Sequence, residues 1–151
     1  MREYVAALKR DIMKLTKYTD YAMRVLFFLA TKPSGQGTVS EVAETYKISR
    51  NHLVKVVQNL VKFGYVESTK GRGGGMKLAQ DSSKIVLGQV VRKMEPDMHL
   101  IDCIGCEVAR VCKLPGPLHK AISAFIHVLD EYSLSDIVNS SEGITDLLHS
   151  N

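Results

Sequence analysis

Apolar residues recur at helical spacing near the start of the chain. Between residues 17 and 30 they stand at Ala22, Val25, Leu26 and Leu29. This spacing places them on one face of a helix, and Thr16 precedes them where it can cap the helix start. The pattern predicts a first helix over residues 17–30 with a single buried face.

A shorter helix is predicted after residues 33–37, Pro-Ser-Gly-Gln-Gly, which interrupt this pattern. Residues 38–41, Thr-Val-Ser-Glu, match a capping box, in which the threonine and glutamate side chains bond to backbone N–H groups at the helix start. The residues expected to face inward are Val42, Ala43 and Tyr46. A turn at residues 47–49 then leads to the next helix.

The third predicted helix covers residues 50–63. Ser49 can cap its start, and Gly64 follows its end at a position that favours a left-handed backbone. Its apolar face consists of Leu53, Val56, Val57 and Leu60. A short helix, a tight turn and a longer helix form a helix-turn-helix, so residues 50–63 are the predicted recognition helix.

A β-hairpin is predicted after this helix. Residues 65–68 and 76–78 are short strand candidates, and the loop between them, Thr-Lys-Gly-Arg-Gly-Gly-Gly, is too rich in glycine to pack through its side chains. Its tip carries Lys70 and Arg72 and can enter a minor groove, whose potential attracts cations. The alternative is a phosphate-binding loop, which leads into a helix, whereas a strand is expected here.

Positive charge is concentrated in the same part of the chain. The formal net charge of the whole protein is +4. Residues 49–77 contain one acid, Glu67, and six basic residues, which gives +5 for this segment and −1 for the remainder; the basic residues are Arg50, Lys55, Lys62, Lys70, Arg72 and Lys77. Such a field is expected of a surface that binds phosphates, although a solvated helix face is the alternative.

Composition indicates one small protein core. The chain has 151 residues, 45% of them hydrophobic, which suffices for a single core with an appendage. No apolar run approaches the length of a membrane span, and charged residues interrupt residues 1–12 where a signal peptide needs an apolar stretch. We therefore expect a cytoplasmic protein with no membrane partner.

The only cysteines of the chain are Cys103, Cys106 and Cys112, within ten residues of one another. Three thiols cannot all pair as disulfides, and in a reducing compartment such a cluster favours a soft metal or an iron-sulfur cluster with one further ligand. The Cys-x-x-Cys spacing also suits a zinc site or a dithiol switch. A thiol–disulfide exchange enzyme would require a strand-helix-strand setting, which is absent around Cys103.

These features together resemble the family of iron-sulfur winged-helix transcriptional repressors over about residues 13–138. The resemblance rests on residues 15–24, 49–57, 70–75 and 90–96 and on the cysteine cluster. It implies a mainly α fold with a small β-hairpin wing, and a DNA-binding repressor rather than an enzyme. It also implies a homodimer on double-stranded operator DNA, with recognition helices in major grooves and wings in minor grooves.

The resemblance further implies a cluster, [4Fe–4S] favoured and [2Fe–2S] the alternative, beside a long dimerisation helix. That helix would cover residues 117–132, with an apolar stripe of Leu118, Ile122, Phe125, Ile126 and Leu129. A partner subunit is the natural cover for this stripe, and the first helix of the same chain is the alternative. The predicted organisation is an extension at 1–12, a winged helix-turn-helix at 13–80, and the cluster loop with the dimerisation helix at 81–151.

The fourth ligand separates members of the family. IscR-type members have a histidine three residues after the last cysteine, where this chain has Pro115. NsrR-type members, which sense nitric oxide, have a Thr-Asp pair near the start of the first helix, and Thr19-Asp20 matches it. The resemblance thus implies Asp20 of the other subunit as fourth ligand, with His119 or Asp102 as alternatives. An ordinary ion pair between Asp20 and Arg24 is the competing interpretation.

The resemblance also implies the signal, in that nitrosylation of the cluster releases DNA. Sensing of iron, of cluster status or of oxidants uses the same frame, and a zinc-stabilised DNA-binding protein is a further alternative. The first turns of a recognition helix reach the base edges. The DNA contacts are therefore expected from Ser49, Arg50, Asn51, His52 and Lys55, together with Lys70 and Arg72 of the wing.

Overall fold

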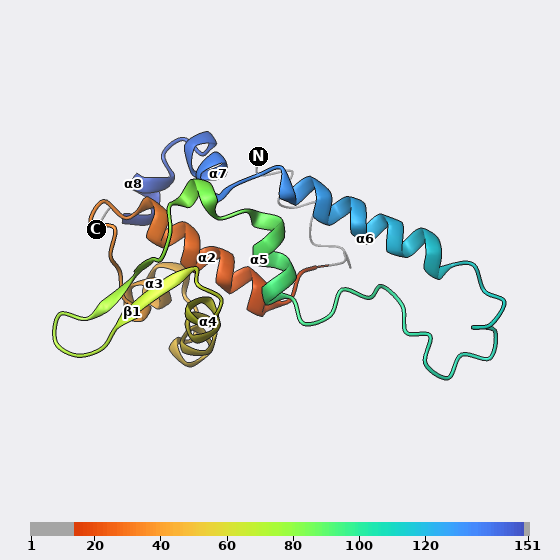
Figure 1. The fold of residues 1–151 in the computed structure, drawn as a ribbon. Helices are drawn as coiled ribbons and strands as arrows, with labels where there is room; N and C mark the ends of the chain where they lie inside the picture. The colour runs from red at the N-terminus through yellow and green to blue at the C-terminus, as the bar shows by residue number, and fades with distance from the viewer. Residues whose placement is uncertain (1–13, 150–151) are drawn as a thin grey trace.

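The computed structural model describes residues 14–149, so the predicted extension at residues 1–12 lies outside the described part. Its elements in chain order are α2 (Lys17–Thr31), α3 (Val39–Tyr46), α4 (Arg50–Lys62), β1 (Val66–Thr69), β2 (Gly75–Leu78), η1 (Ser82–Lys84), α5 (Leu87–Met94), α6 (Pro115–Asp130), α7 (Leu134–Ser140) and α8 (Ile144–His149). The fold is mainly α with one two-stranded antiparallel hairpin, as the sequence predicted (Figure 1).

Helix α2 is the centre of the core. Its stripe of Ala22, Val25 and Leu26 is fully buried, and Phe28 and Leu29 are nearly so. The Thr16 side chain accepts a hydrogen bond from the Thr19 N–H, so the predicted cap is present. The helix-turn-helix, the hairpin, α5 and α7 all contact α2. Helix α2 is therefore the element against which the rest of the core packs.

The helix-turn-helix forms as predicted. At the start of α3 the Glu41 N–H donates to Thr38 Oγ1 at 3.2 Å and the Thr38 N–H donates to Glu41 Oε2 at 2.7 Å, which completes the capping box. Lys47 closes α3 in the left-handed conformation, at φ 54°. The apolar face of α4 is buried at all four predicted positions: Leu53, Val56, Val57 and Leu60.

One of the two predicted caps of α4 is present and the other is not. Gly64 adopts φ +77° after the last turn, as expected. Ser49 occupies the N-cap position, but its side chain makes no capping hydrogen bond, so the predicted side-chain cap was wrong. At φ −57° and ψ 125°, Ser49 contributes through its carbonyl oxygen, which accepts from the Leu53 N–H at 3.2 Å.

The hairpin is fastened to the body of the protein. Strands β1 and β2 pair from Val66 with Leu78 to Thr69 with Gly75, close to the predicted limits. Gly37, between α2 and α3, exchanges two backbone hydrogen bonds with Met76, at 2.9 and 2.7 Å. The base of the wing is therefore fixed to the helix-turn-helix, and only the glycine-rich tip extends beyond it (Figure 1).

Segments after residue 80 complete the same core. Ile85, Val90, Met94 and Leu134 belong to the hydrophobic cluster that α2 and α4 build. The short helices α7 and α8 were not predicted from the sequence. The signal for α7 was present at Ser133 and Asp136, whose side chains form a second capping box at its start.

Helix α6 projects away from this core, as Figure 1 shows. It begins and ends two residues earlier than predicted, because Pro115 starts it and Glu131 caps it. It packs on α5, where a Cβ at Gly88 would lie 2.1 Å from Asp130 Oδ1, so only glycine allows this approach. No helix in the described part is long and apolar enough to cross a membrane.

Candidate nucleic-acid interface and metal centre

The outward face of α4 gathers the predicted recognition residues. Ser49, Arg50, Asn51, His52 and Lys55 are all exposed. Sequence reasoning missed Val54, whose side chain is 38% exposed, and Gln58, which is exposed as well. The spacing of Gln58 could have revealed it, since Gln58 follows Asn51 by seven residues and so lies on the same helix face two turns later.

Helix α4, the predicted recognition helix, is held at its middle by the start of α2. The Tyr18 hydroxyl donates to the Lys55 carbonyl oxygen at 3.0 Å and accepts from the Asn59 side-chain amide. These bonds occupy the flank of α4 next to α2. They leave the face with Asn51 and Gln58 open to a ligand.

The wing tip presents two cations. Lys70 and Arg72 are exposed, and neither forms a salt bridge within the described residues. Lys77, lower on the hairpin, instead pairs with Glu67 across the strands at 3.1 Å. In Figure 1 the hairpin and α4 lie along the same edge of the molecule, so a single nucleic acid can contact both.

The three cysteines lie in the long connection between α5 and α6 (Figure 1). All are free thiols; Cys106 is exposed, while Cys103 and Cys112 are half-buried. Three thiols fit an iron-sulfur cluster, because thiolates are the usual ligands of its iron atoms. A fourth ligand would have to come from another residue. Within residues 14–149, however, no three His, Cys, Asp or Glu side chains are gathered closely enough to hold a metal ion.

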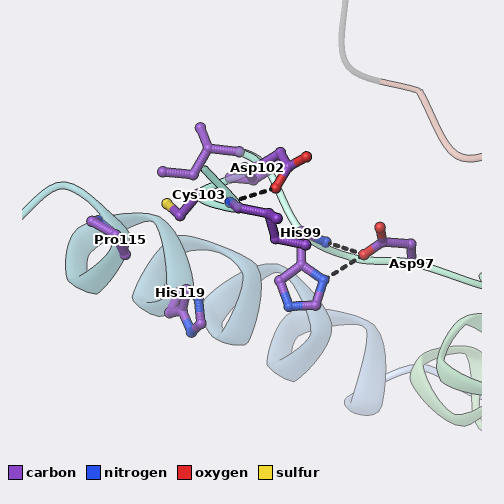
Figure 2. A pocket seen from close by; sticks show the side chains of 9 residues that line it. Asp97, His99, Asp102, Cys103, Pro115 and His119 are labelled. Atoms are coloured by element: carbon purple, nitrogen blue, oxygen red, sulfur yellow. Dashed lines mark hydrogen bonds and ion pairs between the residues drawn. The ribbon is translucent and has the colours of Figure 1, made fainter. Parts of the chain in front are cut away.

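A cavity of about 670 Å³ opens beside Cys103, between the loop and the first turns of α6 (Figure 2). His119 and Asp102, the alternative fourth ligands, both line it, as does His99. The His99 and His119 rings lie 6.1 Å apart, centre to centre. Asp97 binds His99 through the backbone N–H and through Nδ1, and these hydrogen bonds hold the pKa of the Asp97 carboxyl below its ordinary value.

Asp20 does not line this cavity. It lies in the first turn of α2, where Arg24 Nε donates to both of its carboxylate oxygens at 3.1 and 3.0 Å. Both side chains are about two-fifths exposed. Within one chain Asp20 is therefore an ion-pair partner, and its contribution to a cluster of a second subunit remains a prediction.

Glu95 connects the start of the cysteine loop to the start of α2. Its carboxylate accepts from the Thr16 N–H at 3.1 Å, from the Thr16 hydroxyl at 3.2 Å and from the buried Thr19 hydroxyl at 2.5 Å. Glu95 also ends α5, at the point where the loop begins. Sequence reasoning missed this role because the two partners lie 76 and 79 residues away from Glu95.

Solved structures of known regulators share this fold. CymR, the global cysteine regulator of B. subtilis, superposes with a TM-score of 0.69 and 23% identity, over 87% of this chain and all of that one. IscR of T. potens gives a TM-score of 0.69 and 24% identity, over 86% of this chain and 89% of that one.

Sequence comparison identifies the family. The HTH-type transcriptional regulator NsrR of Bacillus subtilis is 46% identical over 142 residues, which cover 90% of this chain and 97% of that protein. The NsrR of Shouchella clausii is 39% identical over the same share of this chain and 95% of its own. The Rrf2 profile, described as an iron-dependent transcriptional regulator, matches residues 15–140. This chain belongs to the Rrf2 family of winged-helix transcriptional regulators.

Proposed function

We propose that this protein is a cytoplasmic transcriptional repressor whose iron-sulfur cluster reports nitric oxide by releasing operator DNA. The single observation that carries the proposal is the continuous set of contacts from the cysteine loop to the recognition helix. Glu95 at the start of the loop binds Thr16 and Thr19 of α2, and Tyr18 between them binds Lys55 and Asn59 of α4. The relatives named NsrR support the same conclusion.

Cys103, Cys106 and Cys112 would hold the cluster, [4Fe–4S] rather than [2Fe–2S], and Asp20 of a second copy would complete it. A bound cluster supplies iron that nitric oxide can attack. A carboxylate is a hard ligand and a weak partner for cluster iron, so Asp20 would be the weakest of the four ligands. Arg24 would hold the Asp20 side chain in position, since its Nε donates to both carboxylate oxygens.

The homodimer is proposed from the apolar side chains of α6. Leu118 and Ile122 are only half-buried, while Phe125 and Val128 are 38% and 53% exposed. Apolar side chains that gather exposed on one helix are typical of interaction sites. A second copy of α6 would cover it and would set the spacing of the two recognition helices on a palindromic operator.

On DNA, α4 would lie in the major groove and the wing tip in the minor groove. Asn51 and His52 would contact base edges, and Ser49, Arg50 and Lys55 would position the helix on phosphates and bases. Lys70 and Arg72 would enter the minor groove, where the negative potential is greatest when the groove is narrow.

Anaerobic purification followed by iron and sulfide analysis tests the cofactor directly. We expect iron and inorganic sulfide in equal amounts, four of each per chain for the favoured cluster, with a visible absorption band that nitric oxide alters. A colourless protein that contains zinc would refute the proposal. Zinc is the specific rival because His99 and His119 line the same cavity as Cys103, and zinc accepts both imidazole and thiolate ligands.

A further inference from the structure

Cys103 and Cys106 are the two ends of a tight turn. The Cys106 N–H donates to the Cys103 carbonyl oxygen at 3.3 Å. Gly105, the third residue of the turn, has φ +74°, the left-handed conformation that a type II turn requires at this position. Asp102 Oδ1 accepts from the Ile104 N–H at 2.8 Å and so fixes the entry to the turn.

Such a turn brings the Cα atoms of its end residues within about 7 Å of each other. Disulfides span Cα separations of about 4.4–6.8 Å, so a turn of this kind keeps the backbones of its two end residues in the range that a disulfide bridges. Both thiols are free, with Cys106 exposed and Cys103 half-buried. Cys112 lies outside this turn, since its N–H bonds to the Val108 carbonyl oxygen at 2.9 Å.

We propose that Cys103 and Cys106 form a reversible disulfide whenever the protein carries no cluster, with a peroxide as the oxidant. The exposed Cys106 thiol reacts first: its sulfur attacks one oxygen of hydrogen peroxide, the O–O bond breaks, and the leaving hydroxide takes a proton to become water. The Cys103 sulfur then attacks the resulting sulfenic acid. The S–O bond breaks, the S–S bond forms, and a second water leaves, so that two thiols and one peroxide give one disulfide and two waters.

The disulfide would control loading of the cluster. Oxidation removes two of the three thiols, and Cys112 alone cannot hold the metal. Cluster assembly would then require prior reduction by a dithiol. This consequence rests on the proposed function, whereas formation of the disulfide depends only on the turn.

The test uses the full-length, cluster-free, reduced protein with hydrogen peroxide. We expect the number of free thiols to fall from three to one, the intact mass to fall by about 2 Da, the two hydrogens lost per disulfide, and peptide mapping to link Cys103 to Cys106. Three thiols that survive the oxidant without forming a disulfide would overturn the proposal. A bond that involves Cys112 would overturn it as well.

Two variants separate the turn from mere thiol reactivity. Cys112→Ser should still form the disulfide at the wild-type rate. Gly105→Val keeps both cysteines but places a β-branched residue at φ +74°, and should slow closure about tenfold. Equal rates in Gly105→Val and wild type would contradict the role of the turn.

Failure of this inference can be told apart from failure of the proposed function. A protein that forms the Cys103–Cys106 bond but never acquires iron supports the disulfide and refutes the cluster. A protein that loads a cluster, yet keeps three thiols under peroxide once the cluster is removed, refutes the disulfide alone.

Discussion

At the residue scale, Asn51 and Gln58 point the same way from α4. Both are exposed, and each carries an amide that can bond adenine through two hydrogen bonds in the major groove. Between them, Val54 offers methyl groups that can contact a thymine methyl. Arg50 and Lys55 flank these side chains with charges that any phosphate satisfies. Sequence specificity is therefore expected from the amides and non-specific affinity from the cations.

Replacing Gln58 or Asn51 by alanine tests this division. Each should lower the preference for operator over random DNA by roughly 1–3 kcal/mol, the usual worth of a bidentate base contact, while non-specific binding stays nearly unchanged. Competition binding with labelled operator measures the preference. Lys55→Ala is the contrast and should weaken operator and random DNA alike; unaltered discrimination in both amide variants would show that α4 is not the reading helix.

Asp20 gives a second test at this scale. If Asp20 is only the ion-pair partner of Arg24, then Asp20→Ala and Arg24→Ala should behave alike, with slight loss of stability and an unchanged cluster spectrum. If Asp20 is a ligand, its alanine variant should form a less stable cluster with an altered spectrum. Each cysteine changed to alanine should abolish loading. Anaerobic spectra decide, and an unaltered spectrum in Asp20→Ala would defeat the assignment.

At the element scale, the exposed cations of the wing lie at its tip and the paired cation lies on its strands. Lys70 and Arg72 lie at the tip, while Lys77 is already paired with Glu67 on the strands. The double change Lys70→Ala with Arg72→Ala should weaken operator binding and lower the slope of log affinity against log salt by up to about 2, because fewer counterions are released. Lys77→Ala is the matched control and should leave the slope intact. Identical slopes in all three proteins would exclude the tip from phosphate contact.

Helix α8 is fixed to the end of α2 by His149. Its ring packs edge-on against Phe28, 4.7 Å between ring centres, and its Nε2 lies 2.9 Å from Thr31 Oγ1. Burial, assisted by the charge of Lys32, lowers the pKa of His149 below 6.5. Between the lowered pKa of His149 in the folded protein and its ordinary value in the unfolded chain, the folded protein binds fewer protons. The free energy of unfolding therefore rises with pH across that interval.

His149→Gln should therefore cost on the order of 1 kcal/mol at pH 7.5. The difference from wild type should shrink as the pH falls below 6.5, since the native contribution of His149 is lost there. Urea unfolding at several pH values measures it. His127→Gln changes an exposed histidine on α6 and should leave the free energy of unfolding unchanged at every pH. A loss of stability in His149→Gln that is the same at every pH would show that only packing matters.

At the scale of the whole molecule, the sequence predicted those features that depend on residues close together in the chain. The capping box at Thr38, the stripe of α4 and the glycines of the wing act within a few residues, so the helix-turn-helix and hairpin were predicted closely. The hydrogen bonds from Glu95 to the start of α2 join residues nearly 80 positions apart, and no local sequence pattern predicts them. Asp20 as a ligand requires a second chain, which no periodicity encodes.

The proposed sensing mechanism depends on the path from the cysteine loop through Glu95 and Tyr18 to α4. If that path transmits the state of the loop, the two ends of the protein are coupled, and cluster chemistry changes DNA affinity without touching the DNA-binding face. Uncoupled parts would give a metal-stabilised DNA-binding protein with constant affinity.

The most direct measurement is the anaerobic fluorescence anisotropy of a labelled operator, selected from random duplexes by the iron-loaded protein, during titration with nitric oxide. We predict that loaded protein releases this DNA as nitric oxide is added, and that a Cys112→Ala variant shows no response. Operator affinity that stays constant through complete reaction with nitric oxide would contradict the account.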